Sequence, residues 1–93
     1  MSNAAIILIG MCKKFLALEI EIEAFVQCYQ EYFEDHQKQL IAGEFDKLDE
    51  IYMTCEYFQP DEGIRSADWH YLSESQVRET IARKVKEFEA ISV

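Results

Sequence analysis

The chain has 93 residues, of which 49% are hydrophobic and 13% aromatic, so we expect one globular domain spanning residues 1–93 rather than a disordered acidic tail. Eighteen Asp and Glu against nine Lys and Arg give a net charge of −9. Such a charge disfavours self-association and direct binding to nucleic acid or anionic membranes, and it attracts basic proteins.

The spacing of apolar residues predicts helices in the first half of the chain. A helix from about residue 4 to 17 has a broad apolar stripe that includes Ile6, which places this helix at the centre of the core. A second helix, from about residue 22 to 38, carries aromatic residues at spacings of three and four. Glu23 lies in its first turn, where the helix dipole favours negative charge.

Two further helices are predicted in the second half. The third runs from about residue 44 to 59 and ends before Pro60, because the residue before a proline is pushed out of helical geometry. The fourth runs from residue 74 to about 90, and Ser73 with Gln76 forms a capping box at its start. The inward stripe of the third helix is predicted to be Phe45, Leu48, Ile51 or Tyr52, Cys55 and Phe58.

Residues 61–72 are predicted to be a connecting loop. It is polar at first and then carries Trp69, His70 and Tyr71, aromatic residues that we expect to cover the open end of the core. Four amphipathic helices joined by short links predict an all-α fold, a small antiparallel four-helix bundle.

The three cysteines, Cys12, Cys28 and Cys55, are odd in number and widely spaced, which predicts neither a disulfide framework nor a zinc knuckle. Each falls at an apolar position of a predicted helix, so we expect three buried thiols. Reduced thiols indicate the cytoplasm. The N-terminal sequence has no signal-peptide pattern, and no apolar run reaches the length of a membrane span.

Catalytic motifs are absent from the sequence. It contains no glycine-rich phosphate loop and no nucleophile elbow. The Glu-x-x-His pairs of helical di-iron sites are excluded, because Phe33 and Ala67 stand three residues before His36 and His70. We interpret His36 as an exposed residue near a helix end, with weak metal binding as the alternative. We therefore predict no enzyme, no catalytic residue, no bound metal and no cofactor.

The negative charge is concentrated in the middle of the chain. Residues 1–14 carry +2, residues 15–64 carry thirteen acids and two bases for −11, and residues 65–93 are neutral. Scattered surface acids ordinarily serve solubility alone, and that interpretation stays open. A block this large and this poorly compensated favours a basic protein partner equally.

A ridge of carboxylates is predicted on the third helix. If its apolar stripe points inward, Asp46, Asp49, Glu50 and Glu56 lie on its other faces, and Asp61 and Glu62 continue the charge past its end. Carboxylates accept charge-assisted hydrogen bonds from Lys, Arg and protonated His, each about 1.5–3 kcal/mol when well made. Tyr57 lies off the inward stripe and is a candidate aromatic anchor, because Tyr is enriched in interface hot spots.

At this ridge the sequence also resembles a known family. Residues 56–61 read EYFQPD, which resembles the E-x-F-x-P-D segment of the colicin D-type immunity proteins, bacterial proteins that protect their makers against nuclease toxins. Residues 15–20, FLALEI, followed by Phe25, resemble that family's F-L-A-x-x-I with a later F. Further likenesses are Arg65, Val77, Arg78 and the pair Glu87-Phe88.

The resemblance implies a four-helix bundle that plugs the basic active site of a toxin, typically a ribonuclease that cuts transfer RNA. The chain would act in a 1:1 complex, with carboxylates where phosphates would otherwise lie. By carry-over, Glu56 and Asp61 are the best contact residues. Colicins and the toxins of contact-dependent growth inhibition both use such partners.

Two alternatives remain open. A DNA-mimic inhibitor would share the acidity but would need charges spread at the spacing of a duplex. A small helical enzyme would need two or more carboxylates and a His converging inside the bundle.

Overall fold

The computed structural model describes the backbone of residues 1–91 and the side chains of residues 1–90. Over that range the prediction of an all-helical chain is confirmed, with four long helices and one short one. The elements are α1 (Asn3–Leu16), α2 (Ile22–His36), the 3-10 turn η1 (Gln37–Gln39), α3 (Glu44–Glu56), α4 (Glu62–Ala67) and α5 (Glu74–Ile91).

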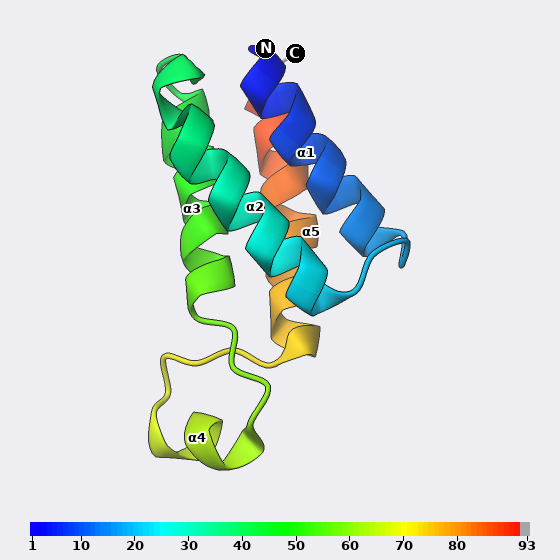
Figure 1. The fold of residues 1–93 in the computed structure, drawn as a ribbon, viewed down its shortest axis with the longest axis vertical. Coiled ribbons are helices and arrows are strands. Elements are labelled where there is room, and N and C mark those ends of the chain that lie inside the picture. Colours follow the sequence, from blue (N-terminus) through cyan, green and yellow to red (C-terminus); the bar gives the residue numbers. More distant parts are fainter. Residues whose placement is uncertain (92–93) are drawn as a thin grey trace.

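The four long helices pack around a shared core. α1 packs against α2 and α5, and α3 packs against the same two helices from the other side. In Figure 1, α1 leads away from the end of the molecule where it begins, α2 returns to that end, α3 leads away again and α5 returns. The segment that contains α4 projects beyond the opposite end (Figure 1).

The core is built on aromatic rings. Phe15 of α1 stacks on Phe25 of α2 with ring centroids 4.4 Å apart, and Tyr29 and Phe33 continue the row along α2. The Tyr29 ring is fully buried, and its hydroxyl donates a hydrogen bond to the Leu48 carbonyl of α3 at 2.8 Å. The apolar stripe of α5, formed by Val77, Ile81, Val85 and Phe88, is buried in the same core.

On α2 and α3, two residues predicted to point inward are exposed. Cys28 is exposed, because the buried aromatic residues of α2 follow a spacing of four that selects the neighbouring Tyr29. Phe45 is 37% exposed because it lies in the first turn of α3, where it contacts only the edge of the core at Phe33. Cys12 and Cys55 are buried as predicted, and burial raises the pKa of the Cys55 thiol to about 12.

The apolar stripe of α1 is narrower than predicted. Ile6 and its neighbour Ile7 are exposed, whereas Leu8, Ile9 and Cys12 are buried. The buried residues of α1 lie on the side that contacts α2 and α5, whereas Ile6 and Ile7 lie on its outer side in solvent.

α3 ends three residues before the predicted end at Gln59. Beyond Glu56 the chain is drawn into a short backbone pairing, in which Leu72 N–H donates to the Tyr57 carbonyl at 2.7 Å and Gln59 N–H donates to the Leu72 carbonyl at 2.9 Å. We call this pairing the neck, and residues 59–71, which it closes off, the lobe. Phe58 and Leu72 pack against the core.

The lobe contains α4, where the sequence predicts a loop. Asp61 is its N-cap, and the carboxylate accepts a hydrogen bond from Ile64 N–H at 3.1 Å. The capping box of α5 is confirmed, because Gln76 N–H donates to the Ser73 hydroxyl at 3.3 Å and Ser73 N–H donates to the Gln76 side-chain oxygen at 2.9 Å.

The turn after α1 contains a strained residue. Leu18 has φ 64°, and the hydrogen bonds from Leu18 N–H to Phe15 and from Glu19 N–H to Lys14 form the cap in which glycine is usual. A left-handed conformation costs an L-residue about 1–2 kcal/mol. The Leu18 side chain is 75% exposed, so packing returns little of that cost.

We expect Leu18→Gly to raise the free energy of unfolding by about 0.5–1 kcal/mol, because relief of the strain exceeds the added chain entropy of glycine. Urea denaturation measures the change. Leu18→Ala is the matched control, since it removes the side chain but keeps the strained Cβ. Equal stability of the two variants would contradict the strain argument.

Glu44 joins the start of α3 to the start of α1. Its carboxylate accepts hydrogen bonds from Ser2 N–H at 2.9 Å, the Ser2 hydroxyl at 2.6 Å and Ile41 N–H at 3.1 Å. Burial raises the pKa of Glu44, but these hydrogen bonds outweigh it and leave the pKa below its usual value of 4.5.

We expect Glu44→Gln to lower the free energy of unfolding at neutral pH by about 1.5–3 kcal/mol, because charge-assisted hydrogen bonds are lost. A depressed folded-state pKa stabilises the fold above the unfolded-state pKa, and this contribution is lost as the pH falls through the folded-state value. The difference from wild type should therefore shrink below about pH 4.5. Asp46→Asn, in the same helical turn, should show a smaller loss, about 0.3–1 kcal/mol, in the same denaturation series.

Candidate protein-binding surface

Charge is divided between the two pairs of packed helices. α2 and α3 together carry nine acids and one base, for −8, whereas α1 and α5 carry four acids and six bases, for +2. Because α2 packs against α3 and α1 against α5, the negative charge gathers on one side of the molecule. We call the acids that α2 and α3 present there the acidic face: Glu23, Glu31, Glu34, Asp35, Asp46, Asp49, Glu50 and Glu56.

Ion pairs neutralise acids mainly on the other side. On α5, Glu74 pairs with Arg78 at 2.9 Å and Glu89 pairs with Lys13 of α1 at 2.8 Å. On the acidic face, among the residues that the structure describes, only Glu50 has such a partner, Lys84 at 2.9 Å. The hydrogen bond from Lys84 is the main cause of the lowered pKa of Glu50. The rest of the acidic face keeps its charge uncompensated.

Neutral donors hold several of these carboxylates in place across the seam between α2 and α3. The Tyr52 hydroxyl of α3 donates to Glu34 Oε2 of α2 at 2.6 Å. The Gln30 amide of α2 donates to Glu56 Oε2 of α3 at 2.8 Å. These bonds orient the carboxylates and leave their charge available, because a neutral donor adds no positive charge.

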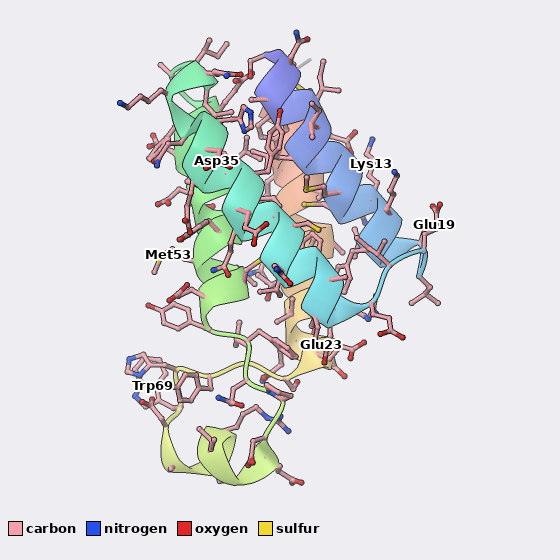
Figure 2. All side chains as sticks on the ribbon, in the orientation of Figure 1. Lys13, Glu19, Glu23, Asp35, Met53 and Trp69 are labelled. Atoms are coloured by element: carbon pink, nitrogen blue, oxygen red, sulfur yellow. The ribbon has the colours of Figure 1, made fainter. Side chains whose placement is uncertain are left out.

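The four ridge residues of α3 lie off its core side, as the sequence predicts. Asp46, Glu50 and Glu56 are exposed and Asp49 is half-buried. They do not form one line: Glu50 turns toward α5, where it meets Lys84, and Glu56 turns toward α2. Figure 2 shows Met53, from the turn between them, projecting outward from α3.

Asp61 and Glu62 lie apart from that ridge. Both are exposed, but they belong to the lobe, where Asp61 caps α4. Within residues 1–90, no hydrogen bond or ion pair joins either of them to a carboxylate of α3. The structure therefore places the predicted contact residues on two separate parts of the molecule.

The contribution of α2 was missing from the predicted ridge. Glu31, Glu34 and Asp35 lie on the exposed side of a helix that carries no Lys or Arg. The acidity of this stretch is visible in the sequence, but its position beside Tyr52 and Glu56 depends on how α2 packs against α3.

The aromatic residues of segment 61–72 do not cover the core as expected. Trp69 is 85% exposed, and Figure 2 shows it at the margin of the molecule. Phe58 and Leu72 close that end of the core instead, because the neck fixes both residues against it. Tyr57 is 36% exposed, as the sequence predicts.

The described residues also bear on whether the chain holds a metal site or a membrane span. Across the described residues, no group of three or more His, Cys, Asp or Glu is placed to hold a metal ion. Within the same range, no helix has the length and apolar character needed to cross a membrane.

Compared with known proteins, the chain matches no family model, no curated sequence and no solved structure.

The seam gives a titration test. The hydrogen bond to Glu34 raises the pKa of Tyr52 to about 12, so this bond should hold below the usual tyrosine pKa of 10 and be lost as the pH rises through 12. Glu34→Gln should move the Tyr52 midpoint down toward 10, measured by NMR of the labelled ring. Glu31→Gln, whose carboxylate bonds to Gln27, should leave it unchanged. A midpoint near 10 in the wild type would contradict the bond.

Proposed function

We propose that the chain is an antiparallel four-helix bundle and acts as an immunity protein of the colicin D type. It binds a cognate bacterial ribonuclease toxin domain that cuts transfer RNA and neutralises it in a 1:1 complex in the cytoplasm. The resemblance at residues 15–20 and 56–61 supports the family, and the alternating direction of the long helices in Figure 1 supports the architecture.

The observation that carries the proposal is the uncompensated charge of the acidic face. A nuclease cleft is basic because it binds phosphates, and carboxylates held at fixed positions can occupy the places of those phosphates. Each well-made bond to a Lys, Arg or protonated His is worth about 1.5–3 kcal/mol. The long-range field also speeds encounter with a basic partner.

The proposed contacts combine both parts of the surface. Glu56 is the main contact residue on α3, and Asp46, Asp49 and Glu50 contribute from the same helix. Glu31, Glu34 and Asp35 extend the contact onto α2. Asp61, Glu62 and Tyr57 lie at or next to the lobe. Capping engages one oxygen of Asp61, and the other is left for the toxin.

The length of the acidic face favours binding to an enzyme cleft over mimicry of a DNA duplex. α2 has 15 residues, so the acidic face extends about 22 Å along the molecule. One turn of duplex DNA is longer, about 34 Å. A charged surface of this length suits the active site of a small enzyme better than the groove of a protein that follows DNA over several turns.

The test uses the protein encoded immediately upstream. Its C-terminal domain is expressed in a bacterial host with and without this chain, and growth is scored. We expect the domain to arrest growth alone and to be silenced by the chain. Glu34→Lys with Glu56→Lys should weaken binding of the domain at least tenfold and impair rescue. Asp61→Asn keeps an N-cap and tests the charge of Asp61 separately.

Glu79→Lys is the matched control. Glu79 is exposed on α5 outside the acidic face, so the same change of charge there should leave rescue intact. Circular dichroism checks that every variant folds. The proposal for that pair would be overturned if the upstream-encoded domain does not arrest growth, or if it still arrests growth when this chain is present. Equal rescue by the α2–α3 and α5 variants would show that the acidic face is not the contact.

A further inference from the structure

Three aromatic rings form a row where the lobe meets α3. The His70 imidazole stacks on the Trp69 indole with ring centroids 4.0 Å apart, and it also stacks with the Tyr57 ring at 6.2 Å. We call these three residues the aromatic stack. Tyr57 directly follows α3, so the stack continues from the end of the acidic face at Glu56. In Figure 2, Trp69 and Met53 of α3 project from the same edge of the molecule.

Hydrogen bonds fix the stack in position. Asp68 Oδ1 accepts from His70 N–H at 2.9 Å and from His70 Nδ1 at 2.6 Å, and these bonds lower the pKa of Asp68. Asp68 N–H in turn donates to the Arg65 carbonyl at the end of α4. The ring of Trp69 stacks on an imidazole that these bonds hold in place, and a preorganised side chain loses little entropy on binding.

Trp69 combines this order with exposure. It is 85% exposed, with one side against His70 and the rest open to solvent. Single exposed apolar residues are ordinary on protein surfaces, but a Trp that stacks on a hydrogen-bonded imidazole is suited to be an interface anchor, since Trp is enriched in hot spots. A shallow hollow of about 360 Å³ lies beside it, lined also by Glu62 and Arg65.

The charges around the stack indicate what it binds. Glu56 precedes Tyr57, Asp68 precedes Trp69, and Glu62 shares the hollow beside it. Arg65 is the only base that lines that hollow, and its guanidinium donates to the Gln59 carbonyl at 2.8 Å. The surroundings are thus net negative. A planar guanidinium suits an exposed indole best, because Trp is the strongest cation–π acceptor and Arg stacks flat.

We propose that Trp69 is a second anchor for the toxin, separate from the acidic face, and that its open ring face stacks on an arginine side chain of that basic partner. This inference rests on the proposed function. Under this proposal, the acidic face covers the basic cleft of the toxin, and Trp69 of the lobe binds an arginine at the edge of that cleft.

The chain contains one tryptophan, so its tryptophan emission, excited at the red edge where tyrosine does not absorb and corrected for the emission of the partner domain, reports on Trp69. The probe is the C-terminal domain of the upstream-encoded protein, separated from its complex with this chain in denaturant and refolded. We expect the domain to shift the emission and to protect it from acrylamide. Trp69→Ala should weaken binding, measured by calorimetry, about tenfold or more, and Trp69→Phe less.

The outcomes separate this inference from the proposed function. Ile64→Ala changes another exposed apolar residue of the lobe and should bind as wild type. If Trp69→Ala also binds as wild type, or the emission and its quenching stay unchanged while Glu34→Lys with Glu56→Lys abolishes binding, the anchor is refuted and the acidic face stands. If the wild-type chain does not bind the domain at all, both proposals fail.

Discussion

The row of aromatic rings along α2 is the constraint on which the rest of the structure depends. Phe25, Tyr29 and Phe33 occupy one side of this helix at a spacing of four, and Phe15 extends the row to α1. The Tyr29 hydroxyl then ties α2 to α3 through the Leu48 carbonyl. With their inner sides committed in this way, α2 and α3 have only their outer sides left for charged residues.

That commitment produces the uneven surface. A chain with a charge of −9 must place like charges near one another somewhere, which costs the fold some self-repulsion. Here the bases sit largely on α1 and α5, where they neutralise the acids of α5 and leave those of α2 unmatched. Gln30 and Tyr52 of the seam orient two of these carboxylates without relieving the repulsion. Binding to a basic protein would relieve this repulsion, so the charges that weaken the free chain would favour such a complex.

The sequence predicts the long helices well because each buries a continuous apolar stripe. Their observed bounds lie within a few residues of the expected ones, and the capping box at Ser73 is found as predicted. The sequence does not predict α4, because six residues are too few to show a helical period, although Asp61 is a residue type typical of an N-cap. The exposure of Cys28 depends on whether the residue three or four positions after Phe25 points inward, and the sequence allows both.

The candidate site is less accessible to such reasoning. The acids of α3 could be placed outside the core from their own helix alone. The bonds from Tyr52 to Glu34 and from Gln30 to Glu56 join residues 18 and 26 positions apart, and they require knowledge of how two helices pack. Trp69 belongs to the lobe, which is closed off by the two backbone hydrogen bonds of the neck. The periodicity of the sequence does not predict these bonds.

The neck also makes the lobe a unit that can change by itself. Residues 59–71 leave and rejoin the helices at one point, between Phe58 and Leu72. Doubling the length of a closed loop adds only about 0.6 kcal/mol of closure entropy, so insertions and deletions there are tolerated well. The helical scaffold can thus stay constant while the lobe is lengthened, shortened or exchanged. A set of chains built this way would share one fold and one charged face and would differ in the surface that the lobe presents.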